Sequence, residues 1–129
     1  MKKIISTDKA PQAIGPYSQA IVVNDMVFTS GQIALKPDGS FLEGDVEAQT
    51  TQVLENLKAV LKEAGSSLKK VVKTTIFLAN MDDFAKVNDV YGSFFKENKP
   101  ARSTVAVKTL PKNVLVEMDV IAAAKDFVN

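Results

Sequence analysis

With 129 residues, of which 46% are hydrophobic, the chain is long enough for one domain with a buried core and too short for two, so we expect a single domain over residues 1–129. Its 16 basic and 15 acidic residues leave a net charge of +1, which gives no electrostatic reason to expect a nucleic acid or an anionic membrane as a partner. It has no cysteine and no histidine, which excludes disulfides, thiolate and imidazole chemistry and the usual zinc sites, so any catalysis must use carboxylates, hydroxyls, lysine, arginine, backbone groups and water.

The first part of the chain predicts a hairpin. Residues 1–8 lack the apolar stretch of a signal peptide, and no later run reaches transmembrane length, so we expect a cytoplasmic protein. Gln19–Val23 and Met26–Ser30 are short runs rich in apolar and β-branched residues. Asn24-Asp25 separates them, and two residues of this type suit a tight hairpin turn.

The central part predicts a helix, a strand and a second helix. After Asp45, which can act as the N-cap, apolar residues follow helical spacing until Gly65 ends the helix. Val71–Leu78 is a β-branched run typical of an interior strand. Apolar and aromatic residues at intervals of three and four then predict a second helix from Asp83 to Lys96.

The last part predicts a second hairpin. Residues 102–107 and 114–122 both have the composition of strands, and a short connection separates them. Because side chains alternate across a strand, pairing the two runs places Arg102 on the face opposite the core, close to Asp119 and diagonal to Glu117. A guanidinium and two carboxylates on one patch of a sheet need either water or a defined purpose.

This order of elements predicts a two-layer α/β (α+β) sandwich, in which a mixed sheet has both helices on one face. The opposite face would carry Arg102, Thr104, Glu117 and Asp119 among apolar residues. A half-apolar face left bare would favour association, so we expect this face or its rim to be buried in an oligomer. Elution from gel filtration at the monomer mass would contradict this expectation.

Several segments, in order along the chain, also carry a family resemblance: Ala13–Ala20, Thr29–Ile33, Val72–Phe77, Phe84–Asn88 and Pro100–Ser103. Together they resemble the RidA (YjgF) family, most closely its archetypal reactive-intermediate deaminases. These enzymes hydrolyse 2-iminobutanoate and 2-iminopropanoate to 2-oxo acids and ammonia. The resemblance implies a chorismate-mutase-like fold of the bacillary type, a homotrimer, and three active sites in clefts between subunits.

The resemblance also implies roles for individual residues. Arg102 would bind the substrate carboxylate, Glu117 would position or activate the attacking water, and the backbone carbonyl of Thr104 would help to hold that water. The cleft would further be lined by Tyr17, Ser30, Gly31, Phe84 and Asn88, some of them from the neighbouring subunit. Many relatives have cysteine where this chain has Thr104. A backbone role survives that exchange, whereas thiol-based regulation does not.

These residue types suit the chemistry of a 2-imino acid. The planar fork of a guanidinium can bind both carboxylate oxygens and never loses its charge. An imine carbon is already electrophilic, so no covalent nucleophile, metal or cofactor is needed. A carboxylate that orients water and transfers a proton typically contributes about 10²–10⁴-fold in rate.

Other interpretations of the same residues remain open. Without the resemblance, Arg102 can be a structural ion pair with Asp119 or Glu117, and Asn88 an amide on a helix surface. Tyr17 can pack beneath the first turn instead of contacting substrate. At the level of function, the alternatives are an RNA-acting translation inhibitor or endoribonuclease, and a non-catalytic carboxylate-binding or chaperone-like trimer. The charge balance argues against RNA, because phosphate contacts need clustered lysine and arginine.

Overall fold

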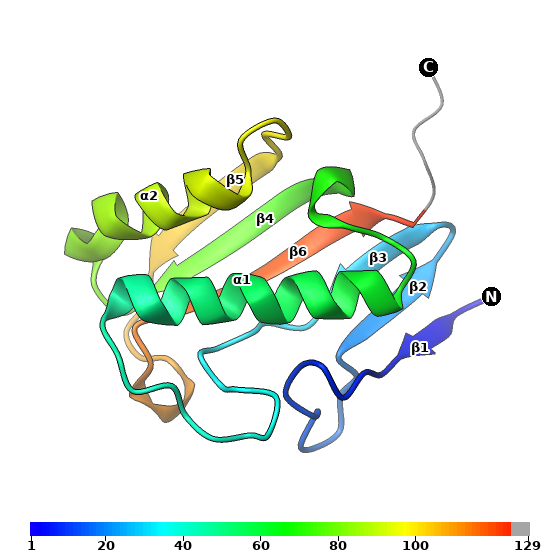
Figure 1. Cartoon of the computed structure of the whole chain (residues 1–129), viewed down its shortest axis with the longest axis horizontal. Coiled ribbons are helices and arrows are strands. Elements are labelled where there is room, and N and C mark those ends of the chain that lie inside the picture. Colours follow the sequence, from blue (N-terminus) through cyan, green and yellow to red (C-terminus); the bar gives the residue numbers. More distant parts are fainter. Residues whose placement is uncertain (125–129) are drawn as a thin grey trace.

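The computed structural model describes residues 1–124, which form one six-stranded sheet with two α-helices on the same face (Figure 1). The strand order is β1-β2-β3-β6-β4-β5. The elements are β1 (Lys3–Ile5), β2 (Ala20–Val23), β3 (Met26–Thr29), α1 (Val46–Glu63), β4 (Val71–Leu78), α2 (Phe84–Phe94), β5 (Ala101–Ala106) and β6 (Val116–Ala123), with short 3-10 turns η1 (Leu68–Lys70), η2 (Met81–Asp83) and η3 (Pro111–Asn113). The predicted two-layer architecture is confirmed, and β1 is an additional strand at the edge.

Local signals in the sequence account for the first hairpin and for α1. Asn24 (φ 51°) and Asp25 (φ 60°) both have left-handed backbone conformations, as a type I′ turn between two strands requires. The Asp45 carboxylate accepts a hydrogen bond of 2.9 Å from the backbone N–H of Ala48, which caps the first turn of α1. Gly65 (φ 79°) lies just beyond the end of this helix, as predicted.

The core lies between the helices and the covered face of the sheet. α1 contributes a stripe of fully buried side chains, namely Val53, Leu54, Leu57, Val60 and Leu61. They pack with alternate residues of the central strand β6, namely Val116, Met118, Val120 and Ala122. In residues 1–124, no helix combines the length and the apolar character that crossing a membrane requires.

The predicted C-terminal hairpin is wrong, because β4 lies between its two strands. β5 pairs in parallel with one edge of β4, and β6 pairs antiparallel with the other edge and also with β3. β4 and β6 alternate between buried and half-buried side chains along most of their length, whereas nearly all of β5 is exposed. A hairpin of β5 with β6 would leave an apolar strand unpaired, so the polar strand takes the edge instead. The connection over residues 107–115 is long enough to cross the end of β4.

This topology also corrects which residues share a face. Arg102 is in register with Thr74, which is fully buried beneath the helices, so Arg102 lies on the helix side of the sheet. Thr104, two residues along the same strand, lies on that side too. Glu117 and Asp119 alternate with the buried residues of β6 and therefore lie on the open face. The prediction that all four share one face is wrong.

The open face of the sheet carries a row of apolar side chains. Ile4, Ile21, Phe28 and Ile121 are paired in register across four strands. Ile4 is 62% exposed and Phe28 43% exposed. Val105, which alternates with Arg102 and Thr104 along β5, is on this face as well and is 43% exposed. The half-apolar open face expected from the sequence is therefore present, without Arg102 and Thr104.

Candidate functional site

A β-bulge brings the chain after β3 against the middle of β6. The last pair of β3 joins Phe28 to Ile121, whereas the next bridge joins Gln32 to Met118, so residues 29–31 face residues 119–120. The extra residue is accommodated by Thr29, whose hydroxyl accepts from the β6 backbone at 3.0 Å and donates to it at 3.3 Å. Bulges of this kind often redirect side chains beside active sites.

Gly31 lies in this bulge and directly faces the Glu117 side chain. A Cβ atom at Gly31 would overlap Oε2 of Glu117, so only glycine leaves room for this carboxylate. The neighbouring Ser30 is fixed through its hydroxyl, which donates to the carbonyl of Ser18 at 2.5 Å, and through its N–H, which donates to the carbonyl of Gln19 at 2.9 Å. The backbone around Gly31 is thus held rigidly against Glu117.

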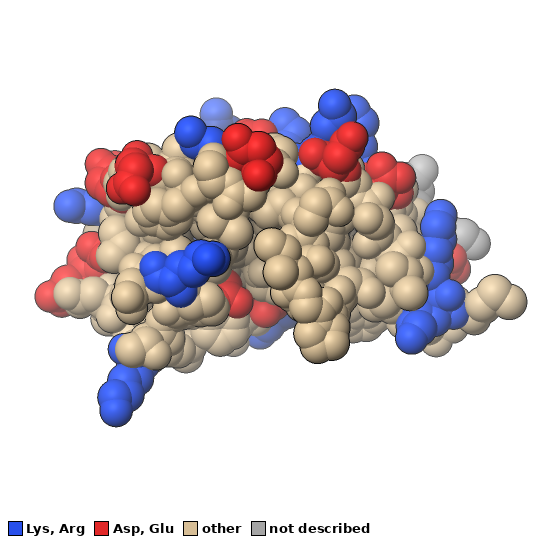
Figure 2. All heavy atoms as spheres, turned by 90° about the horizontal axis from the view of Figure 1, so that it is seen from below, with Lys and Arg blue, Asp and Glu red and all other residues tan. Residues whose placement is uncertain are grey.

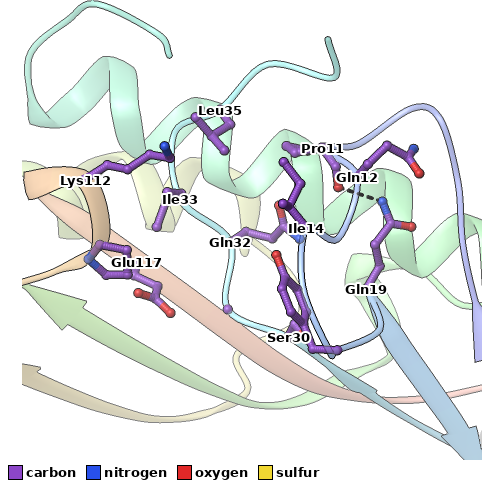
Figure 3. A pocket seen from close by; sticks show the side chains of 13 residues that line it. Pro11, Gln12, Ile14, Gln19, Ser30, Gln32, Ile33, Leu35, Lys112 and Glu117 are labelled. Carbon is purple, nitrogen blue, oxygen red and sulfur yellow. Dashed lines mark hydrogen bonds between the residues drawn. The ribbon is translucent and has the colours of Figure 1, made fainter. Parts of the chain in front are cut away.

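Ser30, Gly31 and Glu117 line a pocket of about 530 Å³ between three loops. In Figure 3, Glu117 and Lys112 reach it from one side, and Ile14, Gln19 and Ser30 from the other. The full lining is Pro11, Gln12, Ile14, Tyr17, Gln19, Ser30, Gly31, Gln32, Ile33, Leu35, Pro111, Lys112 and Glu117. Apolar residues, several amide and hydroxyl side chains, one lysine and one carboxylate thus line the pocket, a mixture typical of a small-molecule site.

The environment of Glu117 alters its titration. Burial raises the pKa of the Glu117 carboxyl, and the negative charge of Asp119 raises it further. Burial also raises the pKa of Asp119. Both effects disfavour the ionised form, because a half-buried carboxylate is poorly solvated. A raised pKa brings Glu117 closer to neutral pH, where a carboxyl can both accept and return a proton.

Arg102 does not line this pocket and lies against α2. Its Nη1 donates to Oδ1 of Asn88 at 2.8 Å. Its Cζ lies 4.8 Å from the ring centroid of Tyr91 and 5.4 Å from that of Phe84. These three residues recur at helical intervals of four and three, so one face of α2 forms the whole support. Within residues 1–124, no carboxylate forms an ion pair with this exposed guanidinium.

The site residues predicted from sequence therefore divide into two groups within one chain. Tyr17, Ser30, Gly31 and Glu117 line the pocket, and Phe84, Asn88 and Arg102 form the cluster at α2. Arg102 and Glu117 lie on opposite faces and two strands apart, which alone separates their backbones by roughly 10 Å. The predicted proximity of Arg102 to Glu117 and Asp119 is wrong, and so is an ion pair between them in one chain.

Thr104 belongs clearly to neither group. Its hydroxyl oxygen is buried and has no hydrogen-bond partner among the described residues. Burying a hydroxyl without a partner is costly, so this side chain is not explained by the packing of one chain. The sequence offered only its backbone carbonyl as a functional group.

Sequence reasoning missed several residues that the structure brings to these groups. Lys112 reaches the pocket from a loop in which Lys112 (φ 55°) and Asn113 (φ 53°) are both left-handed. Asn113 was a usable signal, because asparagine tolerates this conformation better than most residues. In the sequence, Tyr91 contributes to the periodicity that predicts the second helix. Its spacing of three residues from Asn88 also places both side chains on one face of that helix.

The charges of the described residues bear on metal and polyanion binding. Among residues 1–124, no group of three or more acidic side chains is arranged to hold a metal ion. Figure 2 views the molecule from the side of the loops that line the pocket. This face is mostly uncharged, with acidic and basic side chains intermixed and no continuous basic patch. Such a surface is unlike one that follows a phosphate backbone.

Comparisons with known proteins agree over nearly the whole chain. The family described as "Endoribonuclease L-PSP" matches residues 7–124. A RutC family protein of Pyrococcus abyssi is 53% identical over 94% of this chain and 96% of its own. Reactive Intermediate Deaminase A, chloroplastic, of Arabidopsis thaliana is 49% identical over 94% of this chain and 65% of its own.

Solved structures agree with the fold as well. The YjgF gene product of E. coli is 44% identical and superposes with a TM-score of 0.91, covering 95% of this chain and 99% of its own. E. coli TdcF with bound serine is 45% identical, with a TM-score of 0.90, covering 94% of this chain and 98% of its own. The chorismate-mutase-like arrangement of sheet and helices is thus shared with these proteins.

Proposed function

The chain belongs to the RidA (YjgF) family, and from this premise we propose that it is a cytoplasmic, cofactor-free homotrimeric deaminase of reactive 2-imino acids. Its substrates are 2-iminobutanoate and 2-iminopropanoate, which it converts to 2-oxo acids and ammonia. The observation that carries the proposal is a half-buried carboxyl, Glu117, with a raised pKa at the edge of an apolar pocket. A guanidinium fixed elsewhere on the same chain supplies the complementary cation.

Arg102 is suited to binding the substrate carboxylate. Asn88 and the aromatic rings of α2 hold one edge and one face of the guanidinium, and its exposed N–H groups are free to take both oxygens of a carboxylate. A lysine would supply the charge without the planar fork. The relative TdcF was solved with serine, whose α-carboxylate is the group that such a cation would bind.

Glu117 is suited to delivering water to the imine carbon. Its ionised form orients a water molecule and takes a proton as the oxygen bonds to C2, and the imine nitrogen is protonated. In the resulting carbinolamine, Glu117 takes the hydroxyl proton and passes it to the amino nitrogen, so the C2–N bond breaks with ammonia as the leaving group and the C=O bond of the 2-oxo acid forms. Water and imine are the only reactants consumed, so the atoms balance without a redox partner.

A second copy of the chain is needed to bring the two groups together. Arg102 and Glu117 point from opposite faces of one sheet, so one chain cannot place both on a small substrate. The open face carries exposed apolar residues that a neighbouring copy would bury, among them Phe28 and Val105. We therefore propose that Arg102 of one subunit and Glu117 of the next share each cleft of a closed ring.

The experiment that tests this function follows the decay of a 2-imino acid released by a purified pyridoxal-phosphate-dependent dehydratase. The wild-type protein should accelerate decay, and Arg102→Met and Glu117→Gln should each lose about 10²-fold or more. Lys86→Met and Glu55→Gln remove one charge each from exposed helix positions and should retain the wild-type rate. Full activity in Arg102→Met would refute the proposal, whereas binding of 2-oxobutyrate without turnover would favour a carboxylate-binding protein.

Action on RNA is the alternative that the family description names. Phosphate contacts require clustered cations, and the side of the pocket loops has none (Figure 2). The same preparations should be incubated with single-stranded RNA. Cleavage that is lost in Glu117→Gln would make the nuclease the better assignment.

A further inference from the structure

We infer that Tyr91, anchored by Thr74, is a positioning residue that fixes the plane of the Arg102 guanidinium before substrate arrives. The inference rests on the proposed function, because it assigns Arg102 the substrate carboxylate. It concerns residues that contact the arginine and need not contact the substrate. The observation that supports it is a set of contacts between three elements. Thr74 on β4 contacts Tyr91 on α2, and Tyr91 contacts Arg102 on β5, which is paired with Thr74.

The Tyr91 ring is itself rigidly held. Tyr91 is only 7% exposed, and its hydroxyl shares a buried hydrogen bond of 2.9 Å with the hydroxyl of Thr74. Its ring centroid lies 4.6 Å from that of Phe95, with an angle of 34° between the planes. Phe95 is also buried, at 3% exposure. Both rotation and translation of the phenol are therefore restricted.

Arg102 lies on the strand next to that of Thr74 and contacts the Tyr91 ring. Thr74 and Arg102 are paired residues of β4 and β5, so the anchor of the phenol lies beside the residue that the phenol supports. The guanidinium carbon is 4.8 Å from the Tyr91 centroid, within the range of a cation–π contact. Asn88, one turn earlier on α2, fixes Nη1 at 2.8 Å. The guanidinium thus has an aromatic ring within cation–π distance and a hydrogen-bond acceptor on Nη1.

This support matters because the other ring beside Arg102, that of Phe84, is farther away, at 5.4 Å from Cζ. Arg102 is exposed on an edge strand, and a free arginine side chain loses much rotamer entropy when it is ordered. A guanidinium already fixed in the folded protein loses less when a carboxylate binds. The phenol is suited to this task, because burial raises the pKa of Tyr91 and keeps the hydroxyl protonated for its bond to Thr74.

Two classes of variant distinguish the hydrogen bond between Tyr91 and Thr74 from the contact of the Tyr91 ring with Arg102. Tyr91→Phe and Thr74→Val each remove the hydroxyl hydrogen bond and keep the shape, so each should raise the KM for the imine about three- to tenfold, with kcat nearly unchanged. The double variant should be no worse than either single one, because both remove the same bond. Tyr91→Leu also removes the ring and should raise KM by about tenfold or more.

A matched control isolates the loss of a buried threonine hydroxyl. Thr50 is fully buried in α1, and its hydroxyl donates to the carbonyl of Val46 at 2.7 Å. Thr50→Val therefore removes one buried hydrogen bond far along the chain from Arg102. It should lower thermal stability about as much as Thr74→Val while leaving KM unchanged. If both variants raise KM equally, the effect on KM is only a consequence of destabilisation, and the inference fails.

The decisive measurement needs neither substrate nor activity. Arg102 is the only arginine of the chain, so its Nε–H gives a single side-chain signal in a ¹H–¹⁵N NMR spectrum. The Tyr91 ring should shift this signal in the ligand-free assembled protein. We expect the shift to collapse toward the random-coil value in Tyr91→Leu, and the signal to broaden or move in Tyr91→Phe and Thr74→Val but not in Thr50→Val.

The outcomes distinguish this inference from the proposed function. A signal that is identical in the wild type, Tyr91→Leu and Thr74→Val would overturn the inference, even if the protein deaminates imines. If the signal moves as expected but Arg102→Met hydrolyses imines at the full rate, the guanidinium is positioned as inferred and the proposed function is refuted. Unchanged KM in Tyr91→Phe and Thr74→Val, with hydrolysis dependent on Arg102, would also overturn the inference.

Discussion

The two groups of site residues are built in different ways. Arg102 is exposed on an edge strand, and the side chains of one helix hold it in place. Glu117 is half-buried on the central strand, where a bulge and the backbone at Gly31 enclose it. An exposed cation can meet an incoming group, whereas a carboxyl in a pocket gains a pKa suited to proton transfer from its surroundings.

This difference is the reason that the proposed active site needs two chains. The feature that gives Arg102 its support, the α2 layer, covers one face of the sheet (Figure 1), and the feature that gives Glu117 its pocket lies on the other side. A topology with β4 between β5 and β6 keeps the two apart. In the proposed trimer, association through the open face would complete a site and cover exposed apolar surface at the same time.

Complementation between inactive variants tests this comparison most strongly. Arg102→Met and Glu117→Gln should each be nearly inactive alone. In mixed assemblies formed by refolding equal amounts together, about a quarter of the clefts combine an intact arginine from one subunit with an intact glutamate from the next, so about a quarter of wild-type activity should return. The measurement is the rate of imine decay before and after mixing.

Unmixed variants refolded separately and then combined serve as the control and should stay inactive if subunits do not exchange. Because a site within one chain cannot be restored by mixing, a lack of recovery in verified mixed assemblies would show that the site is not shared. The composition of the assemblies is verified by mass spectrometry under native conditions.

Gly31→Ala should have the next largest effect. The added methyl group would overlap Oε2 of Glu117 and force that flexible side chain to turn away. We expect a loss of about 10- to 10²-fold in kcat, since a misplacement of about 1 Å can cost that much, and only a small change in melting temperature. Gly92→Ala is the matched control, because nothing lies within 4 Å of its new Cβ and alanine favours a helix. Equal activity of both variants would contradict the assigned contact.

Variants of Asn88 test the support of the Arg102 guanidinium. Asn88→Ala removes the acceptor for Nη1 and should raise KM about two- to tenfold. Asn88→Asp keeps an acceptor but adds a negative charge that partly neutralises the guanidinium, so it should raise KM more than alanine does. Steady-state kinetics at low and high salt measure both. A smaller effect for aspartate than for alanine would mean that the charge of Arg102 does not act on the substrate.

The sequence predicted elements that depend on local chemistry. Asn24-Asp25 determined a turn with positive φ angles, Asp45 capped α1, and the β-branched run Val71–Leu78 is a strand with the predicted limits. These features depend on neighbouring residues, which a sequence displays directly. The family resemblance also implied four of the residues that line the pocket, Tyr17, Ser30, Gly31 and Glu117, and three at α2, Phe84, Asn88 and Arg102.

The sequence did not predict the pairing partners of the last two strands. Residues 102–106 and 116–123 are close in sequence, and a hairpin is the default for neighbouring strands, but β6 gains more by pairing with β3 and β4 on both edges. The error placed Arg102 beside Asp119 through strand parity alone. Parity gives the face of a residue only after the partner strand is known, and that choice depends on the burial of the whole sheet.

The smallest expected effect is a shift in the pH dependence of the rate. If the ionised Glu117 activates water, the rate falls as the pH drops through the pKa of Glu117, which burial and Asp119 raise above its ordinary value. Asp119→Asn removes the negative charge that raises this pKa and therefore lowers it, so the acidic limb of kcat/KM should move to lower pH. Glu55→Gln makes the same change in net charge on exposed α1 and should leave the limb in place. A rate that falls as the pH rises through this range would mean that Glu117 acts in its protonated form, whereas a limb that moves to higher pH in Asp119→Asn would mean that Asp119 does not raise the pKa of Glu117.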